Sequence, residues 1–200
     1  MKEPRKYHHG DLRAALLVAA EAELAESGIE GFSLRKVARR AGVSHAAPAH
    51  HFGDANGLLT ALAARGYERL MALADLREPV TGQGPSQLTA YGLAYCDFAR
   101  EYLPLFRLCF ASDRPDFCDP MLSAVSTAAF DRLAQGAAAV SGGPAYGDVD
   151  AMADAYALWS MVHGLADLLA SGRMKGFGDL PPEERDGHIA ALLGRVLPGG

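Results

Sequence analysis

Four basic residues between Ser33 and Gly42 form a pattern suited to binding a polyanion. The planar guanidinium of Arg35 can donate two parallel hydrogen bonds to O6 and N7 of a guanine. Other cations could neutralise backbone phosphates, which would make the affinity fall steeply with salt. They are Lys36, Arg39 and Arg40 and, in the N-terminal arm, Lys2, Arg5 and Lys6. The chemistry that these residues suggest is recognition of duplex DNA.

Two short helices joined by a glycine turn would position this chemistry. Ser33 is a plausible N-cap for a helix with apolar residues at Leu34, Val37, Ala38 and Ala41. Gly42 is placed to end that helix, and Ser44 to cap a second one running to about Phe52. In such a helix-turn-helix, the first helix braces across phosphates and the second enters the major groove with its N-terminal residues towards base edges. The residues expected at the bases are Ser44, His45, Ala46 and Ala47.

Of two other interpretations of this segment, the first stays open and the second is disfavoured. The charges could be the solvated face of an ordinary amphipathic helix. A metal site at His50 and His51 is disfavoured, because adjacent helical positions diverge by about 100° and do not converge on one ion.

The rest of the chain also has helical periodicity, which predicts an all-α fold. Leu12, Leu16, Ala20 and Leu24 trace one stripe of a first helix that Gly28 ends. A helix from Asp54 to about Asp75 leads to a Pro/Gly-rich break at 78–86. Helices are expected near 87–102, 119–140, 149–171 and 183–196, with an irregular or short helical stretch to about 117. We expect a three-helix DNA-binding domain over residues 1–53 and a helical-bundle domain for ligand binding and dimerisation over 54–200.

Composition and charge fit a soluble globular protein with a basic head. The 200 residues are 50% hydrophobic and 22% charged, with a net charge of −5. Residues 1–53 contain 8 Lys and Arg against 6 Asp and Glu. The three cysteines form neither a CxxC pair nor an even secreted framework, and no stretch reaches the ~18 apolar residues of a membrane span. A cytoplasmic location follows as the expectation.

Three runs in the N-terminal quarter resemble the DNA-binding head of the tetracycline-repressor-like (TetR/AcrR) transcriptional regulators. They are Tyr7-His8-His9-Gly10-Asp11-Leu12-Arg13-Ala14-Ala15-Leu16-Leu17, Phe32-Ser33-Leu34-Arg35-Lys36-Val37-Ala38-Arg39-Arg40-Ala41-Gly42-Val43-Ser44, and His51-Phe52 with Gly57-Leu58-Leu59. In the body, Trp159-Ser160-Met161-Val162-His163-Gly164 resembles the signature of the subgroup with a WHG-type C-terminal domain. The resemblance implies a DNA-binding regulator.

The same resemblance shows two departures at positions where relatives hold phosphates. Ala49 stands where the family usually has Tyr, and Ala55 where it commonly has Lys. Neither alanine can make such a contact, so we expect weaker backbone anchoring and a flatter salt dependence. Arg35, His45, His50, His51 and the basic arm would then carry more of the contact. Complete loss of operator binding stays an alternative.

An aromatic-rich stretch suggests where a ligand could bind. Seven of the sixteen aromatics fall between residues 91 and 117, and Tyr91, Tyr95, Phe98 and Tyr102 share one helix face. Such a stripe is more often plain core. Because the resemblance implies an inducer held in the C-terminal bundle, we expect a mostly apolar cavity. Its expected walls are Met71, Tyr95, Phe98, Tyr102, Phe106, Phe110, Tyr156, Trp159 and His163.

Apolar faces on the last two helices suggest a two-fold dimer interface, which would suit a palindromic DNA site. Paired with the same helices of a second copy they would form a four-helix interface. The alternative is that these residues are intramolecular core. They are Leu158, Val162, Leu165 and Leu169, followed by Ile189, Leu192, Leu193 and Val196.

Together these patterns predict a homodimeric, ligand-responsive repressor that binds a DNA operator and is released by a small apolar inducer. We expect no catalysis, metal or cofactor, since HExxH, P-loop, GxSxG and dinucleotide-binding patterns are missing from the sequence. Two alternatives stay open: a helical small-molecule-binding protein or enzyme whose head no longer binds an operator, and a DNA-binding protein without an inducer.

Overall fold

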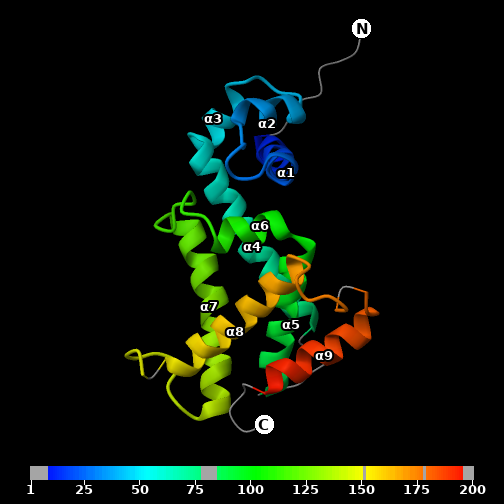
Figure 1. Cartoon of the computed structure of the whole chain (residues 1–200). Helices are drawn as coiled ribbons and strands as arrows, with labels where there is room; N and C mark the ends of the chain where they lie inside the picture. The colour runs from blue at the N-terminus through cyan, green and yellow to red at the C-terminus, as the bar shows by residue number, and fades with distance from the viewer. Residues whose placement is uncertain (1–8, 78–84, 151, 178, 196–200) are drawn as a thin grey trace. The chain divides into compact units, whose positions relative to one another are not determined.

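The chain forms nine α-helices and no β-strand within the residues that the structure describes (Figure 1). The structure is a computed structural model that describes residues 9–77, 85–150, 152–177 and 179–195, and their side chains except at 9–11, 85 and 86. The expected arm contacts Lys2, Arg5 and Lys6 lie outside these residues. The helices are α1 (His9–Ser27), α2 (Leu34–Ala41), α3 (Ala47–Phe52), α4 (Ala55–Arg77), α5 (Pro85–Glu101), α6 (Leu103–Phe110), α7 (Pro120–Ser141), α8 (Ala153–Ala170) and α9 (Pro182–Gly194). The expected all-α class is confirmed.

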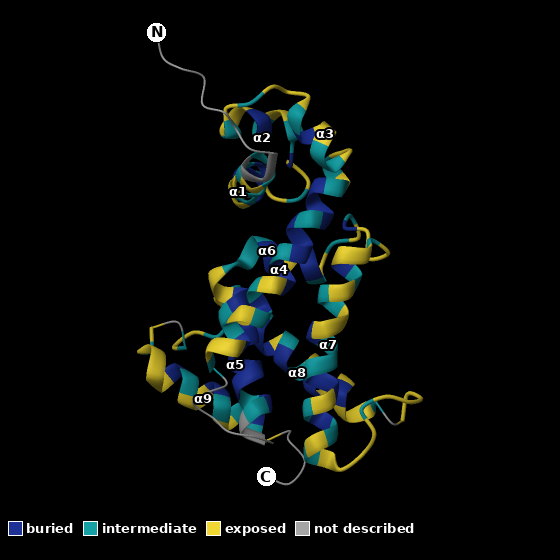
Figure 2. Cartoon of the chain, turned by 180° about the vertical axis from the view of Figure 1, so that it is seen from behind, coloured by how far each residue is buried: buried dark blue, intermediate teal, exposed yellow. Residues whose placement is uncertain are grey.

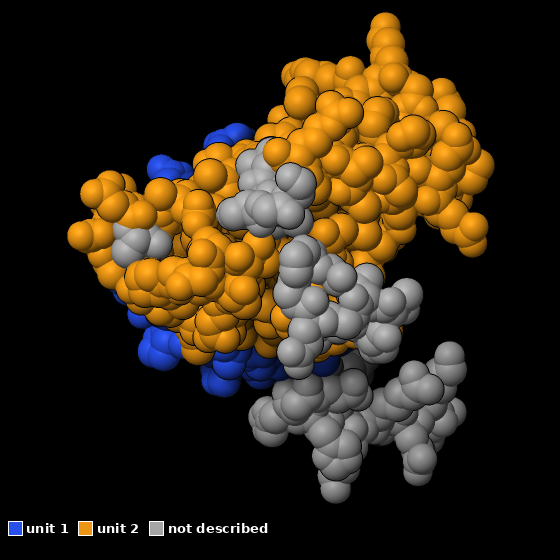
Figure 3. Space-filling view, turned by 90° about the horizontal axis from the view of Figure 1, so that it is seen from below, with its two compact units in different colours: residues 1–66, 104–123 blue, residues 67–103, 124–200 orange. Residues whose placement is uncertain are grey.

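Packing divides the chain into two compact units, coloured separately in Figure 3. Unit 1 comprises residues 1–66 and 104–123, and unit 2 comprises residues 67–103 and 124–200. Helices α4 and α7 each contribute residues to both units. The functional division at residue 53 stays a prediction, because compactness alone does not say which residues bind DNA.

The apolar stripe expected on the first helix forms the core of unit 1 (Figure 2). Leu16, Ala20 and Leu24 of α1 are at most 1% exposed, and Val37 and Ala38 of α2 are completely buried. Gly42 ends α2 with φ of 68°, a left-handed conformation that favours glycine. Burial of these facing rows fixes α2 against α1 and therefore decides which side of α2 remains outside.

The short third helix begins later than its sequence suggests. Ser44 does not cap it; the carbonyl of Ser44 accepts the N–H of Ala47 at 3.0 Å in a turn that precedes the helix. Pro48 lies in the first turn, where a missing N–H costs no intrahelical bond, and its ring is buried. The side chain of Ser33 likewise makes no cap hydrogen bond to α2.

Asp54 does cap the next helix. Its Oδ1 accepts the backbone N–H of Gly57 at 2.9 Å, which satisfies one of the amides left open at a helix start. The helix continues two residues past the expected Asp75 to Arg77.

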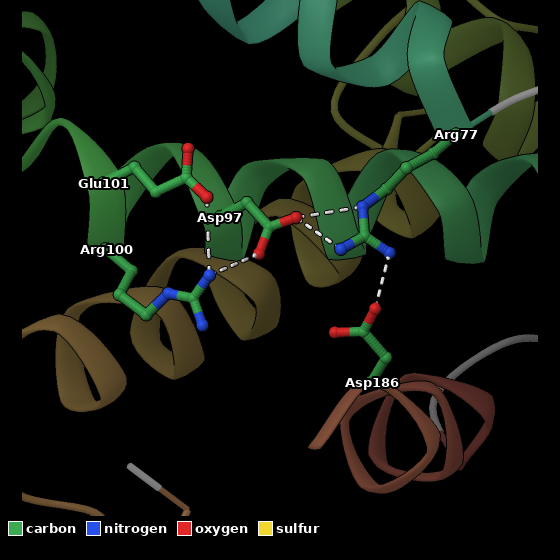
Figure 4. A network of polar contacts seen from close by, with 5 residues as sticks. All are labelled: Arg77, Asp97, Arg100, Glu101 and Asp186. Carbon is green, nitrogen blue, oxygen red and sulfur yellow. Dashed lines mark hydrogen bonds and ion pairs between the residues drawn. The ribbon is translucent and has the colours of Figure 1, made fainter. Parts of the chain in front are cut away.

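In unit 2, helix α5 packs against both α8 and α9. Arg77, the last residue of α4, joins α4 to α5 and α9 through an ion-pair network (Figure 4). Its Nε lies 2.9 Å from Oδ2 of Asp97 on α5, and a terminal nitrogen lies 2.9 Å from Asp186 on α9. Burial opposes the charge, yet the hydrogen bonds to Asp186 and Asp97 raise the pKa of Arg77 above its ordinary value. No described helix is long and apolar enough to cross a membrane.

Candidate functional site

The segment expected to enter the DNA groove lies on the surface of unit 1. Ser44, His45, Ala46, Ala49 and His50 are exposed, and Ala47 and His51 are half-buried. Buried Pro48 holds the segment against the unit. The outward placement fulfils the steric requirement for contact with base edges, whereas the contacts themselves stay predictions.

Four cations on α2 form two adjacent rows. Arg35 and Arg39 are four residues apart and therefore share one side of the helix; Lys36 and Arg40 share the next side, turned by about 100°. Arg35 and Arg39 are both exposed. Lys36 is half-buried and Arg40 is exposed, and both contact acidic residues of α1. Among the described residues, the row formed by Arg35 and Arg39 therefore has no ion-pair partner within the protein, whereas the other row has one.

Glu23 of α1 is the acceptor for the second row, although its side chain is fully buried. Nζ of Lys36 lies 3.2 Å from Oε1, and Nε of Arg40 lies 3.0 Å from Oε2. The Ser27 hydroxyl also donates to Glu23 at 2.7 Å, and Arg40 pairs with Glu26. Burial works against the carboxylate, but the hydrogen bonds from Ser27, Arg40 and Lys36 lower the pKa of Glu23 below its ordinary value.

This cluster includes Lys36, which the sequence suggests as a phosphate contact; that contact stays a prediction. In the structure its ammonium group also donates to the Ser27 hydroxyl at 2.9 Å, so it is engaged within the protein. Sequence reasoning missed Glu23. Its signal is an acidic residue directly before Leu24 on the apolar stripe of the first helix, a position where a charge requires a partner.

Hydrogen bonds between residues far apart in sequence connect three segments of unit 1. Arg114, after α6, donates to the carbonyl of Ile29 at 2.8 Å and to Oδ1 of Asn56 at 3.0 Å. The backbone N–H of Asp116 donates to the Thr60 hydroxyl at 2.9 Å. The turn after α1, the start of α4 and the segment after α6 are therefore joined within unit 1. A polar cleft of about 440 Å³ lies beside these contacts, lined in part by Arg13, His51, Asp54 and Asp119.

Three of the residues expected to bind a ligand meet in unit 2. The Tyr95 hydroxyl lies 3.0 Å from Nδ1 of His163 and accepts a hydrogen bond from Nε1 of Trp159 at 3.4 Å. Phe130 of α7 contacts the Trp159 ring edge-on at 5.8 Å between centroids, and sequence reasoning missed it. Burial lowers the pKa of His163, although Asp167 acts in the opposite direction.

The other expected ligand residues divide between the two units. Phe98 is completely buried as core, and Tyr102 lies beside it with the guanidinium of Arg69 over its ring at 4.5 Å. Phe106 and Phe110 belong to unit 1, where their centroids are 5.3 Å apart. In unit 2 Met71 is half-buried, and the exposed Tyr156 contacts Phe130 with 6.1 Å between ring centroids. A small cavity of about 20 Å³ in unit 2 is lined by none of the nine residues.

The residues expected at the dimer interface are mostly core of a single chain. Five of the eight are at most 8% exposed, because these sides of α8 and α9 belong to the faces buried within unit 2. They are Leu158, Val162, Leu165, Ile189 and Leu193. Leu169 and Leu192 are half-buried, and Val196 lies outside the described residues. The burial of these five agrees with the intramolecular alternative, and the position of a dimer interface stays a prediction.

The cysteines divide into two kinds. Cys96 and Cys109 are buried, and desolvation raises the pKa of each thiol to about 12. Cys118, in contrast, is exposed. No group of three or more His, Cys, Asp or Glu among the described residues could hold a metal ion.

Comparison with known proteins gives two family matches. Residues 88–194 match the model described as "Tetracyclin repressor-like, C-terminal domain", and residues 16–62 match "Bacterial regulatory proteins, tetR family". The HTH-type transcriptional regulator BetI of Burkholderia cenocepacia (strain HI2424) is 32% identical over 111 residues, which are 55% of this chain. The match spans only 57% of the length of that curated relative.

Solved structures agree with the fold. A protein of unknown function from Rhodococcus sp. RHA1 is 32% identical, with a TM-score of 0.75 over 97% of this chain and 99% of that one. A TetR-like transcriptional regulator from the same organism is 18% identical, with a TM-score of 0.65 and full coverage of both chains. The second likeness concerns the fold alone.

Proposed function

The chain belongs to the TetR family of bacterial regulatory proteins, and from this premise we propose that it is a ligand-responsive, DNA-binding transcriptional regulator. It acts as a repressor in the cytoplasm, where α3 of each subunit in a homodimer enters a major groove of a palindromic operator. Successive major grooves on one face of the duplex are ~34 Å apart, which suits a two-fold dimer.

The observation that carries this proposal is the exposed basic surface of unit 1. Ser44, His45 and Ala46 lie outward before α3, and Arg35 and Arg39 lie outward on α2. We assign Arg35 to a guanine and the exposed His45 and His50, with half-buried His51, to the operator's edges and phosphates. The alanines at positions 49 and 55 remove two phosphate contacts that relatives use, and they predict a flatter salt dependence.

The ligand site is proposed in unit 2, around Tyr95, Trp159 and His163. An aromatic wall that carries a hydroxyl, an imidazole and an indole N–H suits a mostly apolar inducer with one or two polar groups. The same Trp159 to Gly164 run supports membership of the subgroup with a WHG-type C-terminal domain. An inducer that binds more tightly to the DNA-incompetent state would release the operator, typically with ~1 to 3 kcal/mol of coupling.

The homodimer is proposed to form through the exposed sides of α8 and α9. On α8, Tyr156, Ser160, Gly164 and Leu168 follow steps of four residues and are all exposed. Small residues in this row would let a second helix approach closely. The same symmetry would place two copies of α3 on one operator.

An electrophoretic shift with the duplex upstream of the chain's own coding sequence tests the function. We expect saturable binding that weakens with salt and is reversed by some apolar ligands. A protein that turns over a ligand and binds no upstream duplex at low salt would instead be the helical enzyme or binding protein, and the proposal would be withdrawn.

A further inference from the structure

We propose that Glu23 is a positioning residue that decides which cations of α2 face DNA. It engages Lys36 and Arg40 in ion pairs with α1 and leaves Arg35 and Arg39 as the cations that reach phosphates and bases. The inference rests on the proposed function, because it concerns how the DNA-binding surface is divided.

The geometry of α2 makes such a division necessary. Its eight residues contain four cations and no acidic residue. Without an internal partner, both rows would present positive charge to the duplex. Phosphates would then attract both rows whatever the base sequence of the DNA. Two rows turned by about 100° from each other can have different partners, so one row can be neutralised by the protein while the other remains outside.

The buried carboxylate of Glu23 neutralises the second row, which consists of Lys36 and Arg40. Each carboxylate oxygen accepts from one cation, Oε1 from Lys36 and Oε2 from Arg40, and Ser27 donates to Oε1 as well. The carboxylate is fully buried, whereas the side chains of Lys36 and Arg40 are 42% and 29% exposed. These two cations therefore lie close enough to the surface to contact DNA once their partner is lost.

A burial cost of this kind is not needed merely to hold α1 against α2. Leu16, Ala20, Leu24, Val37 and Ala38 already form an apolar contact between the two helices, and an apolar side chain at position 23 would avoid desolvating a carboxylate. The specific effect of Glu23 is to orient two cations away from the operator. Its loss is therefore expected to change selectivity and salt dependence, beyond any effect on stability.

The first experiment compares Glu23→Gln with the unmodified protein on operator and on random duplex across a range of salt. We expect the ratio of operator to random affinity to fall several-fold. The log–log salt slope on random duplex should become steeper by roughly 1 to 2, since each added phosphate contact contributes ~0.9. Glu23→Asp keeps the charge and should restore most of the ratio. Glu26→Gln is the matched control, because Glu26 is 68% exposed and its one ion pair among the described residues is with Arg40, which keeps its contact with Glu23.

A second experiment does not depend on how well Glu23→Gln folds. Single changes to Gln at Arg35 and Arg39 should each make the operator salt slope shallower by ~1, whereas the same change at Lys36 or Arg40 should leave it unchanged. Equal slopes for Lys36→Gln and Arg35→Gln would overturn the inference while leaving the proposed function standing. If the unmodified protein binds no duplex at all, the proposed function fails first and this inference fails with it.

Discussion

Neighbouring side chains on α2 have different environments although their chemistry is the same. Both Arg39 and Arg40 reach the surface, but only Arg40 forms a described ion pair, with buried Glu23. Composition or charge counting does not distinguish them, because the distinction depends on the side of the helix that α1 covers. At the scale of single residues, the environment of a cation on α2 is therefore set by the partners that α1 offers it.

Replacing Arg35 by Ala tests the residue expected to contact a guanine. The change should weaken operator binding by about 1 to 3 kcal/mol and relax the preference at one base pair. Titration of operator variants in a fluorescence anisotropy assay measures both effects. Arg173→Ala, at an exposed arginine of unit 2, is the control and should leave both unchanged. An Arg35→Ala protein with full affinity and preference would show that the base-reading surface lies elsewhere.

The lowered pKa of His163 predicts a pH dependence of stability. The unfolded chain takes up this proton near the ordinary value of 6.5, whereas the folded protein takes it up only at lower pH. The stability contribution is therefore complete above about pH 6.5 and is lost as the pH falls towards the lowered value. Urea unfolding at several pH values should show this decline, and His163→Gln should reduce it. His188→Gln, on α9, serves as the control; an identical decline in both variants would contradict the assignment.

The helices were easier to predict from the sequence than the packing contacts between them. The spacing of Leu16, Ala20 and Leu24 located α1, and the glycine at position 42 located the end of α2. Local patterns failed where a boundary depends on packing. The short helix α3 starts at Ala47, after a turn that Ser44 begins, because buried Pro48 anchors its first turn to the unit.

Removing the N-cap of α4 tests one boundary that sequence did predict. Asp54→Ala leaves the N–H of Gly57 without its acceptor and should lower the free energy of unfolding by about 1 kcal/mol. Urea denaturation followed by circular dichroism gives this value. Asp113→Ala, at an exposed aspartate of the same unit, should change it by less than ~0.5 kcal/mol. A loss no larger than the control's would mean that the cap contributes nothing.

The Arg77 network joins three helices of unit 2 and should contribute measurably to their association. Arg77→Met removes hydrogen bonds to Asp97 and Asp186 and should cost about 1 to 2 kcal/mol, because the groups are only partly exposed. Arg100→Ala removes a 3.3 Å contact to the same Asp97 from a side chain that is 37% exposed, and should cost less than ~0.5 kcal/mol. Thermal unfolding of both variants compares them, and equal losses would contradict the central position of Arg77.

For the whole molecule, the sequence identified the fold class and the head, whereas most of the residues that it proposed for a dimer interface are buried within the single chain. Apolar periodicity on α8 and α9 marks a buried face and does not reveal whether the same chain or a second copy covers it. Leu158 and Ile189 turned out to be covered by their own chain. The ligand residues were scattered for a related reason, since Phe106 and Phe110 belong to unit 1 although they follow α5 closely in sequence.

The proposed dimer can be tested on the exposed row of α8. Leu168 is 42% exposed, and Leu168→Glu would place a charge and its symmetry copy near each other, which should shift the protein from dimer to monomer. Sedimentation velocity measures the shift. Leu76→Glu on α4, where the leucine is 75% exposed, is the control and should leave the mass unchanged. A dimer that survives Leu168→Glu would move the interface away from this row.

The difference in exposure between the cysteines allows the protein to be labelled at one of them in solution. A thiol must ionise before it attacks an electrophile, and the raised pKa values of buried Cys96 and Cys109 keep them unreactive near neutrality. Cys118 is accessible and lies in the segment between α6 and α7. A maleimide fluorophore would attach there without any engineered substitution, so its brightness could follow inducer and operator binding in real time.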